Sequence, residues 1–395
     1  MLFDRLAPPE PDQIIALMQA YRDDPRPDRI DLGVGVYRDA AGRTPVMRAI
    51  RAAEARILSE QTTKAYTGLA GEPAFGQAMA DLVLAGVVPG ERMAMAATPG
   101  GTGALRQLME LLRAARPGAA VWVSDPGWPN HPALVHAAGL QLRSYRYLDP
   151  ASGMADLDAM RADLAAAAPG DAVLLHACCH NPCGADPDAA EWAELAAFIA
   201  GRGLLPFLDL AYLGFGDGIH ADAAALRHFA ARFPEVLVAV SGSKTFGVYR
   251  DRVGLALAVC ADAGAAGRVG SMLATLNRQN FAFPPDHGAR AVTTVLTDPL
   301  LRADWEDELG QMRTRIADNR AVLARALRER LQDGRFDFLT AHRGMFSLLG
   351  LTPAQVAALR RDHGIYMTAD SRANLAGLAA PDAPRIAAAV AAVLG

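Results

Sequence analysis

Lysine is nearly absent from this chain of 395 residues. Of its 39 Lys and Arg residues, only Lys64 and Lys244 are lysines. Arginine supplies the positive charge everywhere else, but its guanidinium stays protonated and cannot act as a nucleophilic amine. The two lysines are therefore candidates for amine chemistry, with survival by chance as the alternative explanation.

Other features are missing as well. No apolar run is long enough for a transmembrane helix, and the first residues lack the charged head and apolar run of a secretory signal. The net charge is −4 without a basic stripe, so we expect no nucleic-acid or membrane partner. Four cysteines, three of them at 178, 179 and 183, do not form a disulfide framework. These absences predict a soluble, cytoplasmic protein, and the length predicts more than one domain.

Short apolar runs alternate with helical patterns in the middle of the chain. This alternation is typical of an α/β fold with a mostly parallel sheet and helices on both faces. The candidate strands are 119–124, 172–179, 204–210, 235–241 and 253–260. The linker 242–252 is near the lower length limit for a parallel crossover, so we expect the last strand to be antiparallel. Residues 299–331 predict one long helix that leads into a second domain.

Polar side chains follow the ends of these strands, where open parallel sheets bind their ligands. They are a carboxylate, a phenol, an amide, an indole, an amine and a guanidinium: Asp209, Tyr212, Asn181, Trp128, Lys244 and Arg252. Each also has an ordinary structural explanation as a strand-end cap, a turn or a core residue. Their combination favours a shared crevice.

Pyridoxal phosphate requires this set of groups. Lys244 offers an amine for the aldehyde, and Asp209 offers a buried carboxylate that keeps the ring nitrogen protonated. Tyr212 can donate to the phenolic oxygen, and Trp128 can stack on the ring. The phosphate needs hydroxyls, an arginine and a helix N-terminus. The candidates are Ser241, Ser243 and Arg252, together with Gly101 and Thr102 in the segment 99–106.

Competing motifs are weaker. The G-x-G segments lack the third glycine of a dinucleotide fingerprint. His176 and His180 lie in a strand pattern without the glutamate of a zinc-binding helix. The cysteine cluster is unfavourable for a metal, since adjacent strand residues point to opposite faces. We therefore expect no metal site.

Segments along nearly the whole chain resemble the aspartate and aromatic-amino-acid aminotransferases, a family of class I pyridoxal-phosphate enzymes, and are most similar to its bacterial aromatic or broad-specificity branch. They are IDLGVGVYRD, TTKAYTGLAG, GGTGALR, VWVSDPGWPNH, CCHNPCGADP, FLDLAYLGF, SGSKTFGVYRDRVG, NRQNFAFPPDHG, HRGMFSLLGL and DSRANLAGL. The resemblance implies fold type I, with a mostly parallel seven-stranded sheet and a smaller α/β domain. It places an N-terminal arm and the first part of the small domain at 1–44, the large cofactor-binding domain at 45–311, and the rest of the small domain at 312–395.

The resemblance also implies a homodimer with shared active sites. Arg372 would clamp the substrate α-carboxylate by a bidentate pair, with Gly35, Asn181 and Trp128 beside it. Tyr66 would reach the cofactor phosphate of the neighbouring subunit. Arg278 would enter the neighbouring site to meet a side-chain carboxylate.

The implied reaction is transamination between an aromatic amino acid or aspartate and 2-oxoglutarate, which gives the 2-oxo acid and L-glutamate. The alternatives are a dedicated aspartate aminotransferase and another fold-type I reaction such as β-elimination or decarboxylation. A cofactor-sensing domain of a transcription regulator would need a DNA-binding head, and a nicotinamide dehydrogenase would need the glycine fingerprint. Three departures from the family pattern are Cys183 in place of Thr, the apolar segment 281–283, and Gly242 with Thr245 beside the lysine. The second argues against strict aspartate specificity.

Overall fold

The computed structural model describes residues 2–6 and 13–395 and is built around a seven-stranded sheet in the order β2-β8-β7-β6-β5-β3-β4. The strands are β2 (Met93–Pro99), β3 (Ala120–Asp125), β4 (Gln141–Arg146), β5 (Ala172–His176), β6 (Leu205–Leu210), β7 (Val236–Ser241) and β8 (Val253–Val259). Strand β8 is antiparallel to both of its neighbours, and the other pairs are parallel. The expected antiparallel strand and the mostly parallel sheet are both confirmed, whereas β2 and β4 were not predicted.

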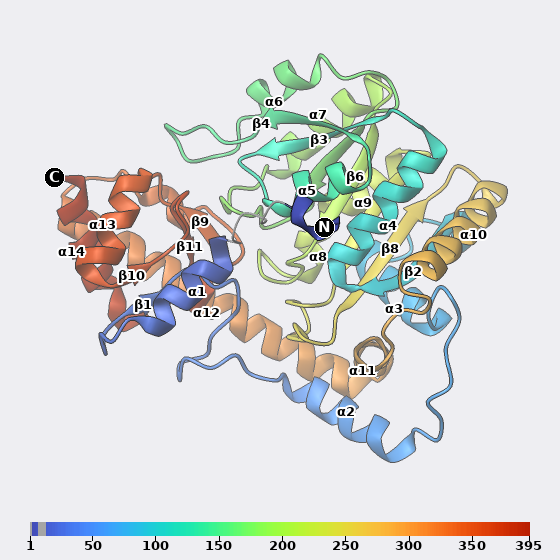
Figure 1. Ribbon diagram of the computed structural model, residues 1–395, viewed down its shortest axis with the longest axis horizontal. Coiled ribbons are helices and arrows are strands. Elements are labelled where there is room, and N and C mark those ends of the chain that lie inside the picture. Colours follow the sequence, from blue (N-terminus) through green and yellow to red (C-terminus); the bar gives the residue numbers. More distant parts are fainter. Residues whose placement is uncertain (1, 7–12) are drawn as a thin grey trace.

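Helices cover both faces of this sheet (Figure 1). Side chains of β7 alternate between the two cores: Leu237 and Ala239 belong to one, Val238 and Val240 to the other. This alternation follows from the period of two in a strand. One core includes α4 (Gly100–Ala115), α5 (Asn130–Ala137) and α10 (Ala263–Asn280). The other includes α2 (Arg48–Glu60), α3 (Pro73–Leu84), α6 (Leu157–Leu164), α7 (Ala189–Gly201), α9 (Ala224–Arg232) and α11 (His287–Thr297).

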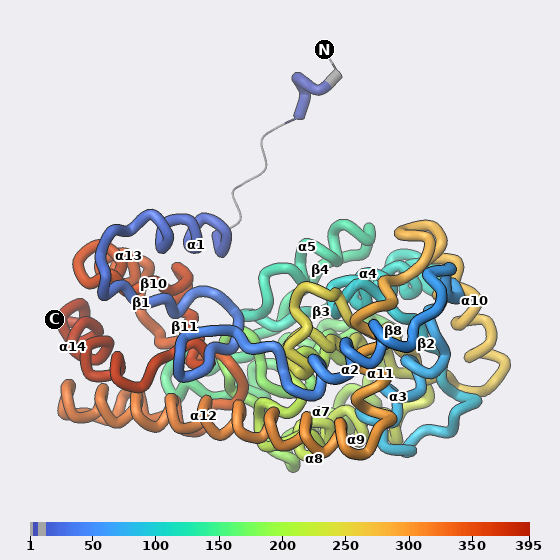
Figure 2. The backbone as a smooth tube through the Cα atoms, turned by 90° about the horizontal axis from the view of Figure 1, so that it is seen from below, coloured from blue at the N-terminus to red at the C-terminus, as the bar shows by residue number. Residues whose placement is uncertain are grey.

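A third core lies beside the sheet and combines residues from both ends of the chain (Figure 1). Ile30 and Ile365 pair across two short parallel strands and are buried together in it. Its elements are β1 (Ile30–Asp31), β10 (Ile365–Tyr366), β11 (Arg372–Asn374), α13 (Pro353–His363) and α14 (Ala383–Leu394), with α1 (Gln13–Asp23) nearby (Figure 2). The apolar residues of the adjoining β9 (Phe346–Leu348) pack in a core of the sheet. Strands β9 and β11 form an antiparallel pair.

The long helix α12 (Pro299–Leu331) connects the sheet to this third core, as the sequence predicted. It begins at the cap residue Asp298, whose carboxylate accepts hydrogen bonds from the first-turn amides. Trp305 and Leu309 are buried with the sheet core, while Leu323 and Leu327 are buried in the third core. Figure 2 shows the helix running along one side of the molecule beneath both parts. Among the helices of residues 2–6 and 13–395, none has the length and apolarity to span a membrane.

The strand directions bring several chain segments to one edge of the sheet. Strands β3, β5, β6 and β7 run parallel, so their carboxyl ends share an edge. Strand β2 is antiparallel to β8, which is antiparallel to β7, so β2 also ends there. Helix α4 starts directly after β2 and points its N-terminus at this edge.

Candidate active site

A cavity of about 220 Å³ lies at this carboxyl edge. Eleven of the predicted site residues line it: Gly35, Gly101, Thr102, Trp128, Asn181, Asp209, Tyr212, Ser241, Ser243, Lys244 and Arg252. The structure therefore brings together residues that the sequence placed after different strands. His176 and Tyr249 also line the cavity and were not among the predicted site residues.

Lys244 follows β7 and is half-buried in the cavity. Its amine lies 5.0 Å from the centre of the Tyr212 ring. Burial lowers the pKa of Lys244, and the nearby Arg252 and Arg372 lower it further, while Asp209 acts in the opposite direction. A lowered pKa increases the fraction of neutral amine, which is the form that attacks a carbonyl carbon.

Asp209 lies buried on β6 and is bonded to a histidine. Its Oδ2 is 2.9 Å from Nε2 of the buried His131. Burial alone raises the pKa of Asp209, but the hydrogen bond with His131 and the nearby Lys244 help to outweigh it and leave this pKa below its usual value. Asp209 is therefore an ionised carboxylate suited to hold a positive charge in the cavity.

His176 is the second histidine that the sequence argument did not assign to the site. Burial lowers the pKa of His176 to about 3, so its imidazole is neutral. Its Nε2 is buried without a hydrogen-bond partner among the described residues, and its ring lies 4.9 Å from that of His131. For His131, a usable signal was its position three residues after Trp128, in the segment that follows a predicted strand; the structure places it in the first turn of α5.

The start of α4 lines the cavity through Gly101 and Thr102. A Cβ added to Gly100 would lie 2.5 Å from the Arg252 guanidinium, and one added to Gly101 would lie 2.8 Å from Ser241. Gly100 also has a φ of 76°, a backbone conformation that favours glycine, and a side chain at Gly101 would have to displace Ser241. Arg252 Nη1 is 3.4 Å from Ser243 Oγ. The free amides of the first helical turn, two hydroxyls and a guanidinium form an anion site.

Arg372 does not line the cavity itself but contacts one of its walls. Its Nη1 donates to Asn181 Oδ1 at 3.4 Å, and Asn181 Nδ2 donates to the Tyr212 hydroxyl at 3.2 Å. The guanidinium is buried 4.4 Å from the centre of the Phe346 ring. Its Nε has no hydrogen-bond partner, and within the described part of the chain Arg372 forms no ion pair. A buried guanidinium with an unused donor is suited to a carboxylate ligand.

Tyr66 and Arg278 are not brought to the cavity of their own chain. Tyr66 is 85% exposed and its ring stacks on Phe283, with 4.6 Å between ring centres. The guanidinium of the exposed Arg278 lies 5.8 Å from the centre of the same Phe283 ring. We call these three residues the Tyr66–Phe283–Arg278 cluster.

Strand alternation was the wrong reason for expecting no metal at Cys178 and Cys179. Strand β5 ends at His176, so Cys178 and Cys179 do not belong to a strand. Cys179 has a φ of 54°, which turns the backbone and breaks the alternation of side chains. The thiols of Cys178 and Cys179 and the Asp222 carboxylate have atoms within 4.8 Å of one another.

The cavity fits pyridoxal phosphate by its donor set. It combines a nucleophilic amine, an ionised carboxylate, a phenol and an anion site in which Gly100 and Gly101 lie close to Arg252 and Ser241. The amine would hold the aldehyde carbon, the carboxylate would face the ring nitrogen, and the α4 N-terminus would bind the phosphate.

Comparisons with known proteins agree. Residues 27–390 match the model of the aminotransferase class I and II family. The chain is 52% identical to an aromatic-amino-acid aminotransferase of Paracoccus denitrificans over 95% of this chain and 96% of that one. It is 41% identical to the aspartate aminotransferase of Escherichia coli over the full length of both. It is also similar to a solved aromatic-amino-acid aminotransferase from Burkholderia pseudomallei covalently bound to pyridoxal phosphate, at 41% identity, full coverage of both chains and a TM-score of 0.97.

The chain belongs to the class I and II aminotransferases. It is an enzyme that uses pyridoxal phosphate to transfer amino groups, and the predicted family, fold class and cofactor are confirmed.

Proposed function

We propose that the enzyme transfers the amino group of aromatic amino acids and of aspartate to 2-oxoglutarate. The observation that carries this proposal is the Tyr66–Phe283–Arg278 cluster, which combines a cation with two aromatic rings. Arg278 suits the side-chain carboxylates of aspartate and 2-oxoglutarate, and the apolar segment 281–283 suits an aromatic ring. Relatives named for aromatic amino acids and for aspartate support both classes, as does a similar structure with 3-indolebutyric acid at 52% identity.

The roles of the residues follow from the cavity. When bound, pyridoxal phosphate supplies an electron sink for the electrons released at the substrate α-carbon. Lys244 would hold the aldehyde carbon of the cofactor, and its free amine would move a proton to and from the substrate α-carbon. Asp209 would stabilise the protonated ring nitrogen, Tyr212 would donate to the phenolic oxygen, and Trp128 would cover the ring face.

The remaining residues position the two ends of the ligands. Arg372 binds the substrate α-carboxylate, with Asn181 and Gly35 beside it. The residues that would hold the phosphate are Gly101, Thr102, Ser241, Ser243 and Arg252, which line the cavity.

We propose further that the enzyme is a homodimer in which Tyr66 and Arg278 serve the partner's site. The exposure of both residues, away from their own cavity, supports this arrangement. A mixture of Lys244→Ala and Arg278→Ala chains tests it. A mixed dimer would contain one site with both residues intact, so aspartate turnover should reappear after subunit exchange. If each chain completed its own site, the mixture would stay as inactive with aspartate as its two components.

Measurement of kcat/KM for aspartate, phenylalanine, tyrosine and tryptophan tests the substrate proposal. Dual specificity predicts that kcat/KM for aspartate and kcat/KM for phenylalanine differ by no more than about tenfold, or ~1.4 kcal/mol in transition-state free energy. A preference for aspartate of about a thousandfold or more, ~4.1 kcal/mol, would identify a dedicated aspartate aminotransferase instead.

The domain division remains part of this proposal, with an arm and first small-domain piece at 1–44, a cofactor domain at 45–311 and the rest of the small domain at 312–395. The separate core shared by Ile30 and Ile365 supports it. The boundary at 311–312 falls inside the continuous helix α12. A cytoplasmic location is likewise proposed.

A further inference from the structure

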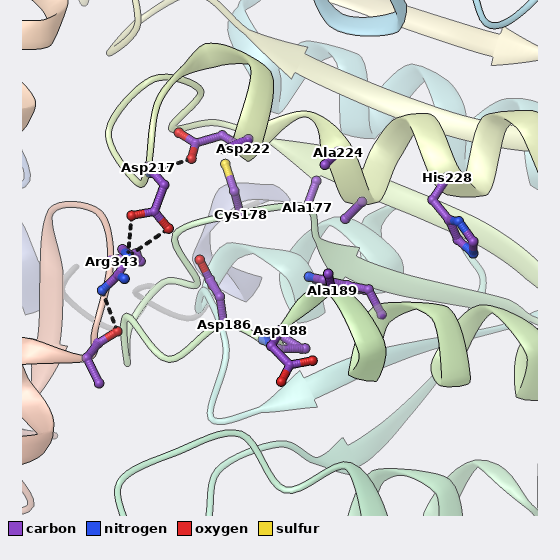
Figure 3. A pocket seen from close by; sticks show the side chains of 15 residues that line it. Ala177, Cys178, Asp186, Asp188, Ala189, Asp217, Asp222, Ala224, His228 and Arg343 are labelled. Atoms are coloured by element: carbon purple, nitrogen blue, oxygen red, sulfur yellow. Dashed lines mark hydrogen bonds and ion pairs between the residues drawn. The ribbon is translucent and has the colours of Figure 1, made fainter.

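A second cavity, of about 600 Å³, lies apart from the cofactor cavity and shares none of its lining residues (Figure 3). It is bounded by the end of β5, the start of α7, α8 (Ile219–Asp222) and α9. Six alanines line it and leave the space open: Ala177, Ala189, Ala221, Ala224, Ala225 and Ala341. Arg343 lies at its side and pairs with Asp217 at 2.8 Å.

Two thiols and a carboxylate meet at one wall of this cavity. Cys178 and Asp222 line it directly, and Figure 3 shows the Cys178 sulfur directed toward the Asp222 carboxylate. Cys179 does not line the cavity, but its thiol, the Cys178 thiol and the Asp222 carboxylate have atoms within 4.8 Å of one another. The left-handed backbone of Cys179 makes this possible, since it places adjacent thiols on one side.

Asp222 is held rigidly at this position. Its Oδ2 accepts hydrogen bonds from the amides of Gly214 at 2.8 Å and Gly216 at 2.9 Å, and its Oδ1 accepts one from Asp217 at 2.7 Å. Within the described residues, no Lys, Arg or His side chain forms an ion pair with this buried carboxylate. A cation bound beside it would supply the missing counter-charge.

We propose that Cys178, Cys179 and Asp222 bind one thiophilic divalent cation of the zinc and cadmium class. Each thiol would give up its proton to solvent on binding, and the cavity would supply water as a fourth ligand. Zinc–sulfur bonds of about 2.3 Å separate two sulfurs on a tetrahedral ion by about 3.8 Å, which the 4.8 Å cluster accommodates. Two sulfur ligands and one carboxylate favour such ions over Mg²⁺ or Ca²⁺.

Titration of the holoenzyme with Cd²⁺ alone tests the proposal, followed by the ultraviolet charge-transfer absorption of cadmium thiolates. Wild type should bind one ion per chain with this band and unfold at a higher temperature when the ion is present. Cys178→Ala and Cys179→Ala should lose both effects. Asp222→Asn should bind about tenfold or more weakly. Cys260→Ala is the matched control, since Cys260 is a free, buried thiol outside the cluster and should leave binding unchanged.

Three results would overturn the proposal: no thiolate band in wild type, a full band in Cys178→Ala, or loss of the band in Cys260→Ala. Cys178→Ser guards against misfolding because it keeps a side chain of similar size. It should retain the absorbance of the bound cofactor while losing the cadmium band. If it retained both, the thiol at 178 would not be a ligand.

Discussion

His131 Nε2 and Asp209 Oδ2 are 2.9 Å apart, and both side chains are buried. The two residues are 78 positions apart in the chain and come from the start of α5 and from β6. The hydrogen bond fixes the orientation of the carboxylate and contributes to the lowered pKa of Asp209. An ionised carboxylate at this depth can hold the proton of a pyridine nitrogen in place.

This pair leads to the first prediction. Asp209→Ala should retain some cofactor but lose about 10²–10³ in kcat, or roughly 2.7–4 kcal/mol, because an electrostatic partner of the developing charge is removed. His131→Phe leaves the carboxylate in place and should cost only about tenfold. Single-turnover rates with aspartate measure both effects. More than half of wild-type activity in Asp209→Ala would mean that Asp209 only caps its strand.

Lys244 is the subject of the second prediction. Lys244→Arg keeps the charge but should abolish turnover, since a guanidinium neither holds the aldehyde nor moves the α-proton. The chain offers a matched control in its other lysine: Lys64 is exposed and bonded to Gln61, so Lys64→Arg should change activity little. Near-normal turnover in Lys244→Arg would contradict the assignment.

Stability should fall on mild acidification because three buried histidines resist protonation. Burial lowers the pKa of His176 to about 3 and of His342 to about 4, and it holds the pKa of His180 well below the usual 6.5. Between pH 6.5 and these values the unfolded chain binds protons that the folded chain does not. The contribution of these histidines to the free energy of unfolding is therefore fully present above pH 6.5. It decreases as the pH falls, by up to about 1.4 kcal/mol per pH unit for each histidine.

Denaturant unfolding from about pH 7.5 to about pH 5 measures this slope. His342→Gln should make it shallower, because that side chain no longer titrates. His220→Gln, at an exposed position on α8, should leave it unchanged. An equal slope in His342→Gln and wild type would contradict the account.

Arg372 gives a prediction about binding. Arg372→Lys should leave the cofactor absorbance intact while kcat/KM falls for every amino acid, by roughly 2–5 kcal/mol in transition-state free energy, because the planar two-donor geometry is lost. Arg56→Lys is the control, since Arg56 pairs with Asp298 at the surface. A defect confined to aspartate and glutamate would show that Arg372 does not bind the α-carboxylate.

Residues that directly follow apolar strands could be predicted from the sequence. Lys244 and Tyr212 come soon after β7 and β6, and parallel strands bring their ends together. The two strands that the sequence did not predict, β2 and β4, are the edges of the sheet. Strand β4 is mostly exposed and reads QLRSYR, so it lacks the apolar run of a buried strand. Strand β2 is built from small residues and Met, which carry little strand signal.

Contacts between loops could not be predicted in the same way. The bond between His131 and Asp209 depends on how the loop after β3 folds, and no pattern encodes that geometry. The meeting of Cys178 and Cys179 depends on one left-handed backbone angle, which reverses the expectation from strand alternation. Both are tertiary properties that periodicity does not report.

The proposed substrate specificity assigns a selective role to Arg278 in the Tyr66–Phe283–Arg278 cluster. Arg278→Ala removes the cation for a side-chain carboxylate, so kcat/KM for aspartate should fall by about 10²–10³, or roughly 2.7–4 kcal/mol. Phenylalanine carries no such carboxylate, and its half-reaction should stay within about tenfold of wild type. Each half-reaction should be measured with one amino acid and without 2-oxoglutarate. The reason is that 2-oxoglutarate also carries a distal carboxylate, so the loss of Arg278 would slow the full reaction with either amino acid. Arg290→Ala, a change on α11 outside the cluster, is the matched control and should affect neither substrate. Equal losses for aspartate and phenylalanine in Arg278→Ala would mean that this arginine supports the structure of the site instead of selecting acidic substrates.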